Sequence, residues 1–186
     1  MAPMSEFSRS VRIDPWPEAG VEIDLRAGPE ERAALARRFQ LVALDALHGW
    51  GRLERADSGE IWFRGWLEAE VVQTCVVSLE DVPATVRVPV ERGFRRVSGE
   101  AARAAASQAS ESAGEWDDDV EPLAGTQIDL GEMLAEELSL ALDPYPRAPD
   151  ADILVSEALG PNISFGSAEP DSPFAALEQL QDKRAR

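Results

Sequence analysis

The chain has 186 residues, of which 44% are hydrophobic and 28% charged, and its formal net charge is −17. This length and hydrophobic content suit one domain with its own core, whereas the charge excludes a protein that coats nucleic acid through a broad basic surface. The sequence predicts no membrane span and no secretory signal. A single cysteine cannot form an internal disulfide, so the cytoplasm is the predicted compartment.

The first half of the chain contains most of the predicted regular structure. Alternating polar and apolar residues predict strands over 8–13 and 21–25. A helix is predicted from Glu30 to about Phe39, because a proline and acidic residues suit the positive end of a helix. The stretch from 41 to 97 is rich in residues that favour strands.

Turn signals divide the stretch from 41 to 97 into three long strands. The turns are expected at 56–59 and 80–83, with the second strand over 61–72 and the third over 84–94. Pro89 favours a sheet edge or a bulge, because proline has no N–H to donate. Short links between long strands predict an antiparallel meander.

Residues 99–122 interrupt this pattern and predict a flexible acidic insertion. Between 107 and 119 the only large core-forming side chain is Trp116. The run Asp117, Asp118 and Asp119 lacks the glycine and the spacing of a calcium-binding loop, so a solvated acidic segment is the favoured interpretation.

The stretch from 127 to 146 predicts an amphipathic helix with well-defined ends. Asp129 is the expected N-cap, and Glu132 follows at the spacing of a capping box. Leucines and a methionine form an apolar face, while Glu136 lies with Glu132 on another face. Prolines at 144 and 146 end the helix.

This helix resembles the signature D-L-x-E-x-x-x-E-E-L-x-L-x-L-x-P-x-P of the YceD family, the bacterial large ribosomal RNA subunit accumulation proteins. Three other segments are similar to that family: 6–9, the segment 71–80 around the cysteine, and 172–177, which reads Ser-Pro-Phe-Ala-Ala-Leu. The four segments occur in order over about 6–180. The resemblance implies a role in 23S rRNA accumulation, through synthesis, processing or protection during large-subunit assembly.

Few groups suited to catalysis are present, so the protein is not predicted to be an enzyme. His48 is the only histidine, and a surface or structural role is the favoured interpretation. No phosphate-binding glycine loop or G-x-S-x-G motif occurs. Many relatives resemble C-x-x-C at Cys75, but Ser78 holds the second position here. We therefore predict no metal and no cofactor, and expect Cys75 to be a small buried residue at a strand end.

Arginine and tryptophan side chains gather on the predicted sheet. Strand alternation places Trp62, Arg64 and Trp66 on one face and Phe63 and Leu67 on the other. Arginine pairs with phosphates and tryptophan stacks on bases, yet arginine lying over tryptophan in ordinary sheet packing explains the same pattern. Both interpretations stay open. The candidate RNA-binding residues are Trp62, Arg64, Trp66, Arg92, Arg95 and Arg96.

These patterns predict an α+β fold, in which an antiparallel meander is joined by the N-terminal strands and covered by two or three helices. We expect one YceD-like domain over 1–186, interrupted by the flexible acidic insertion. Its parts are a β-rich region at 6–98, the insertion at 99–122, the signature helix region at 123–146 and a C-terminal tail at 147–186 with a short terminal helix.

The charge is unevenly distributed, and this asymmetry guides the functional prediction. Residues 1–98 hold 13 basic and 16 acidic side chains, whereas residues 99–186 hold 5 and 19. An acidic C-terminal half favours a non-catalytic factor that binds a basic protein, either a ribosomal protein or an rRNA-processing factor. Direct binding of 23S rRNA or its precursor by the Arg/Trp face is the alternative. The candidate partner-binding residues are Asp117, Asp118, Asp119, Glu132 and Glu136.

Overall fold

The computed structural model describes residues 6–17, 19–97 and 120–151. The chain divides into two compact units, 1–148 and 149–186, and every element below belongs to the first. The α+β class is confirmed. The elements are β1 (Ser10–Arg12), β2 (Val21–Arg26), α1 (Pro29–Arg38), β3 (Ala43–Arg55), β4 (Ile61–Thr74), β5 (Asp81–Val97), β6 (Val120–Ala124), β7 (Gln127–Asp129) and α3 (Leu130–Ala141).

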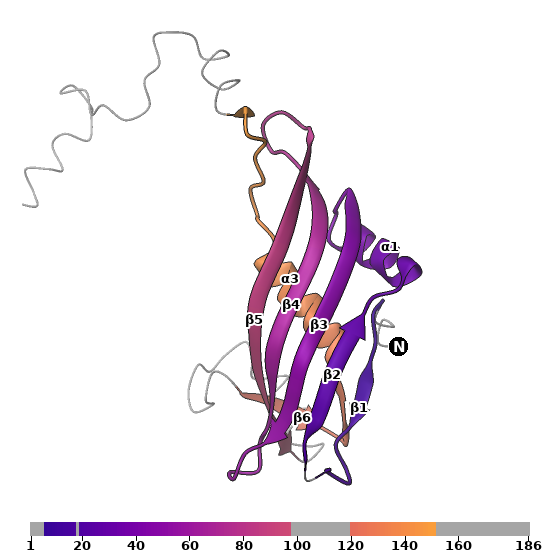
Figure 1. Cartoon of the computed structure of the whole chain (residues 1–186), viewed down its shortest axis with the longest axis vertical. Helices are drawn as coiled ribbons and strands as arrows, with labels where there is room; N and C mark the ends of the chain where they lie inside the picture. The colour runs from indigo at the N-terminus through magenta and orange to yellow at the C-terminus, as the bar shows by residue number, and fades with distance from the viewer. Residues whose placement is uncertain (1–5, 18, 98–119, 152–186) are drawn as a thin grey trace, which may run out of the picture. The chain divides into compact units, whose positions relative to one another are not determined.

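A five-stranded sheet with the order β2-β3-β4-β5-β6 forms the centre of this unit (Figure 1). Strands β2 to β5 pair antiparallel with their neighbours, and β6 joins β5 in parallel over Gly93–Val97. The sheet is therefore mixed. We expected residues 120–122 to belong to the insertion, but they begin β6.

The N-terminal strands do not both join this sheet. Strand β2 does, as predicted, whereas β1 pairs antiparallel with β7 in a separate two-stranded sheet, with Ser10 opposite Asp129. The prediction for β1 was wrong because alternation shows that a segment is extended but not which segment it pairs with. Strand β7 has only three residues and was not predicted at all.

The turn between β4 and β5 lies earlier than predicted. The chain turns over Cys75–Glu80, and β5 already begins at Asp81. Strand β6 pairs with β5 only from Gly93 onward, so within the described ranges the first part of β5 has a partner strand on one side only. Pro89 lies in that part of β5, which confirms the predicted edge position.

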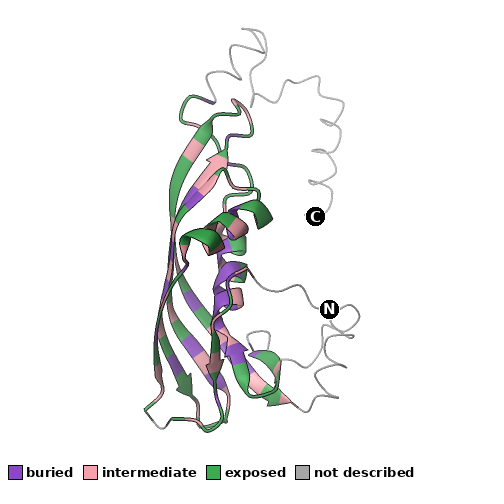
Figure 2. Ribbon diagram, turned by 90° about the vertical axis from the view of Figure 1, so that its right-hand side faces the viewer, coloured by how far each residue is buried: buried purple, intermediate pink, exposed green. Residues whose placement is uncertain are grey.

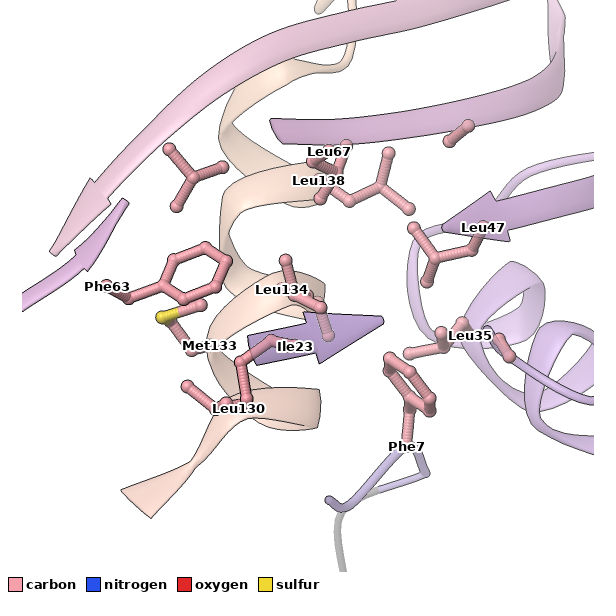
Figure 3. Close-up of a cluster of buried hydrophobic side chains, with 14 of the residues drawn as sticks. Phe7, Ile23, Leu35, Leu47, Phe63, Leu67, Leu130, Met133, Leu134 and Leu138 are labelled. Atoms are coloured by element: carbon pink, nitrogen blue, oxygen red, sulfur yellow. The ribbon is translucent and has the colours of Figure 1, made fainter. Parts of the chain in front are cut away.

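Helices α1 and α3 lie on the same side of the five-stranded sheet (Figure 2). Strand alternation turns Leu53, Phe63 and Leu67 toward that side, where each is fully buried. Helix α3 supplies a stripe of buried side chains at helical spacing, which packs against them (Figure 3). These α3 residues are Leu130, Met133, Leu134 and Leu138.

Two glycines allow close approach of the backbone within this core. A Cβ on Gly49 of β3 would overlap the methyl groups of Leu134, so α3 packs directly over the bare backbone of β3. A Cβ on Gly131 would overlap the carbonyl group of Phe7, which fixes the start of α3 against the N-terminal segment. Both contacts hold α3 at a defined place on the sheet.

The start of α3 confirms the predicted N-cap. The Asp129 carboxylate accepts hydrogen bonds from the N–H groups of Gly131 at 3.1 Å and Glu132 at 3.2 Å. It also accepts from the Ser8 hydroxyl at 2.5 Å and the Arg9 N–H at 2.8 Å. Partial burial raises the pKa of Asp129, but these four donors outweigh it and leave the pKa below its usual value.

Candidate partner-binding surfaces

The first candidate surface is the acidic face of α3, which we define by Glu132, Glu136 and Glu137 together with the side chains that pair with them. Glu132 binds Arg38 of α1, with the closer nitrogen and oxygen 2.8 Å apart, and Arg38 also contacts Glu6 at 3.1 Å. The hydrogen bond to Glu132 raises the pKa of Arg38. Three segments that are distant in sequence therefore meet at Arg38.

Arg92 forms the second ionic centre of the same face. Its guanidinium contacts Glu121 of β6 at 2.5 Å, Glu136 at 2.7 Å and Glu137 at 2.8 Å. The Arg92 side chain is 19% exposed and lies on the side of the sheet that α3 covers. Arg92, a predicted RNA-binding residue, thus meets Glu136, a predicted partner-binding residue, in one cluster.

The acidic face of α3 keeps an excess of negative charge after these pairings. Glu6 and Glu121 of β6 pair with the same arginines, so five carboxylates share two arginines and the cluster has a net formal charge of −3. Beside the two arginines lies an open hollow of about 500 Å³, and Leu140 on its rim is 78% exposed. The hollow is lined by Arg38, Phe39, Arg92, Glu136, Ser139 and Leu140.

The remaining predicted partner-binding residues, Asp117, Asp118 and Asp119, lie outside the described residues.

The second candidate surface is the outer face of the sheet, the side opposite α1 and α3. Trp62, Arg64 and Trp66 project from it, as strand alternation predicted, and Trp66 is 41% exposed. The Arg64 guanidinium lies 5.3 Å from the Trp62 ring centre, and that of Arg87 lies 5.4 Å from the ring centre of Trp66. The aromatic rings thus lie beneath arginines, which the packing interpretation also predicted.

The arginines of the outer face are paired with carboxylates on neighbouring strands. Arg64 contacts Glu91 at 2.8 Å, and Arg52 contacts Glu22 at 3.4 Å. Arg87 lies 3.7 Å from Glu68. These pairs largely cancel the positive charge that phosphate binding requires.

The predicted RNA-binding residues are divided between the two sides of the sheet. By strand alternation, Arg95 projects to the outer face, where it donates a hydrogen bond to Glu60. This hydrogen bond is the main reason that the pKa of Glu60 is lowered. Arg96 projects to the other side of the sheet and contacts Asp14 at 3.3 Å. The sequence did not reveal these acidic partners, because strand register and tertiary contacts decide which carboxylate meets which arginine.

Cys75 is fully buried at the end of β4, as predicted. Its Sγ accepts N–H hydrogen bonds from Ser78 and Ala148 at 3.3 Å and from Val77 at 3.4 Å. The Ser78 side chain and the Ala148 N–H lower the pKa of this thiol to about 6. In the described part of the chain, no three His, Cys, Asp or Glu side chains converge as metal ligands. The sulfur instead joins the β4–β5 turn to the segment that follows α3.

No helix in the described ranges is both long enough and apolar enough to cross a membrane. No curated protein and no solved structure matches the chain. A family model does match, described as large ribosomal RNA subunit accumulation protein YceD, and it aligns with residues 63–181. That match spans more than half of the 186 residues and includes most of β4 and all of β5 and α3. The chain therefore belongs to the YceD family, whose name links it to the accumulation of large-subunit ribosomal RNA.

Proposed function

We propose that this protein is a non-catalytic factor that supports 23S rRNA accumulation by binding a basic protein on the acidic face of α3. The partner class is a ribosomal protein or an rRNA-processing factor, because a protein that holds rRNA needs basic side chains to pair with the phosphates. The observation that carries the proposal is the cluster of five carboxylates around two arginines, with a net formal charge of −3, beside the exposed side chain of Leu140.

The arrangement of these carboxylates suits a cationic partner. Glu136 is 48% exposed even while it pairs with Arg92, so one of its oxygens remains accessible to a second cation. A lysine or arginine of the partner then joins an existing network rather than an isolated charge, and long-range attraction speeds the encounter. Asp117, Asp118 and Asp119 extend the acidic sequence that reaches β6.

Leu140 and the adjacent hollow supply an apolar contact that charge alone lacks. A leucine that is 78% exposed at the rim of a hollow of about 500 Å³ gives the partner a place to bury an apolar side chain. Interfaces gain most of their affinity from such central buried contacts, whereas charges at the rim govern the rate and specificity of association.

The experiment is an affinity pulldown of the tagged full-length chain from cells, with and without RNase, scored for large-subunit proteins and 23S rRNA. The test variant combines Glu132→Gln with Glu136→Gln. A control variant, Asp45→Asn with Asp57→Asn, changes the net charge equally at exposed positions away from α3. We expect the test variant to reduce protein capture about fivefold, which corresponds to about 1 kcal/mol for two partly exposed charges.

Capture should survive RNase and weaken with salt, since charges are screened beyond about 8 Å at physiological ionic strength. Equal losses in the test and control variants would show that net charge, and not this face, attracts the partner. Capture of 23S rRNA that depends on Arg64 and Trp66, together with loss of the captured proteins on RNase treatment, would instead support direct RNA binding.

A further inference from the structure

The outer face of the sheet carries its side chains in three straight rows that cross the strands. The strand register defines these rows, because directly paired residues project to the same side of a sheet. The middle row is Asp24, Trp50, Trp66 and Pro89; one flanking row is Glu22, Arg52, Arg64 and Glu91; the other is Arg26, His48, Glu68 and Arg87.

The charges of these three rows cancel. The rows contain four arginines and four carboxylates, with His48 neutral, so their formal net charge is zero in a chain whose total is −17. The exposed tryptophan, Trp66, stands in the centre of the middle row. No described element covers this face (Figure 2). Two such acidic chains repel each other over most of their surface, but not here.

The two flanking rows are also complementary to each other. When the two-fold axis of a dimer runs along the middle row, each flanking row of one copy faces the other flanking row of the second copy. Glu22 then faces Arg26, Arg64 faces Glu68 and Glu91 faces Arg87, and each of these oppositely charged contacts occurs twice. A two-fold axis parallel to the strands would instead place Arg52 over Arg64 and Glu22 over Glu91, which repel. The charge pattern therefore selects one arrangement.

We propose that the outer face of the sheet binds a second copy of this chain, with the two-fold axis along the row of Trp50 and Trp66. In this isologous dimer each tryptophan meets its own counterpart, and offset aromatic pairs add to the apolar area that they bury. Asp24 also meets the Asp24 of the second copy, at the end of the middle row. Within its own chain this carboxylate lies 3.6 Å from Arg26 and 3.1 Å from His48.

The size of the face suits a weak dimer. The three rows span five residues on each of four strands, so with strands about 4.8 Å apart and roughly 3.4 Å per residue they cover roughly 330 Å² per copy. Two copies then bury about 650 Å², which is in the range of weak, transient contacts. Aligned sheets cross at about 30°, so the rows match best in the centre, on β3 and β4. Arg64 and Glu68 are the central charged pair.

The test measures the mass of the full-length chain by sedimentation equilibrium between about 1 and 200 μM. Arg64→Glu and Glu68→Arg each place like charges opposite each other twice, so each variant alone should weaken self-association at least tenfold. An equimolar mixture of the two variants should associate as tightly as the wild type, because each reversed charge then faces an opposite charge. Arg55→Glu and Asp57→Arg, which lie outside the rows, are matched controls that should leave self-association unchanged.

Recovery in the mixture separates an interface contact from a folding defect, since two damaged chains do not repair each other. Circular dichroism confirms that each variant is folded. A monomeric wild type at 200 μM, unchanged self-association in both variants, or a mixture that stays monomeric would each overturn the proposal. A monomer that binds single-stranded RNA and loses this binding on Trp66→Ala would assign the face to RNA instead.

Discussion

The contact between Gly49 and Leu134 offers the sharpest test of how α3 is held on the sheet. A Cβ at Gly49 would overlap both terminal methyl groups of Leu134, which is fully buried and has little room to move. Gly49→Ala therefore forces either the leucine or the helix away from β3. Overpacking of this kind costs about 1–3 kcal/mol of folding free energy.

The same geometry predicts that a second substitution relieves the first. Leu134→Ala alone should cost about 2–5 kcal/mol, because burial is lost and a cavity remains. In the double variant the new methyl group at position 49 occupies part of that cavity and meets no side-chain methyl. The double variant should therefore be about 1–2 kcal/mol more stable than the sum of the two single effects implies.

Urea denaturation of the four proteins, followed by circular dichroism at one pH, measures this coupling. Leu140→Ala is the matched control, because Leu140 lies on the same helix, is 78% exposed and should cost no more than about 0.5 kcal/mol. Its effect should add to that of Gly49→Ala. If the Gly49 and Leu134 substitutions also add within about 0.5 kcal/mol, the proposed close approach of α3 to β3 is wrong.

Three further substitutions test the polar contacts. Asp129→Ala should lower stability by about 1–2 kcal/mol at pH 7, and urea denaturation should show the difference shrinking below pH 4, because an aspartate with a lowered pKa loses its contribution as it is protonated. The pKa of the Cys75 thiol is lowered to about 6, so the stability of the wild type should rise between pH 6 and about 8.5. Thermal unfolding should show that Cys75→Ser abolishes this rise. Arg92→Met leaves three carboxylates without their shared cation and should cost about 1–3 kcal/mol in the urea assay.

Local signals in the sequence predicted the elements whose ends are set by neighbouring residues. Asp129 begins α3 because a carboxylate at that position caps N–H groups only two and three residues ahead. The second long strand was predicted because alternation determines which side each side chain faces, and Phe63 and Leu67 are indeed buried while Trp66 is exposed. Both signals act within a few residues.

Contacts between distant segments escaped prediction for the opposite reason. Strand β6 has one apolar side chain packed against the core, Leu123, and its structure depends on β5 beside it. The cluster at Arg92 joins residues from β5, β6 and α3, so no short sequence pattern contains it. Sequence reasoning assigned Arg92 and Glu136 to competing surfaces, although they form one ion pair.

The separation of charge between the two sides of the sheet makes the two proposals compatible. Self-association as proposed uses the three rows of the outer face whose charges cancel, whereas partner binding uses the acidic face of α3 on the opposite side of the sheet. A dimer therefore presents two acidic faces at once, and two linked sites hold a partner with paired binding sites more tightly than one site does. A variant that cannot self-associate, such as Arg64→Glu, should then keep the affinity for a single soluble basic partner but lose part of its retention on a surface densely coated with that partner. Equal losses in both formats would mean that Arg64 itself contacts the partner.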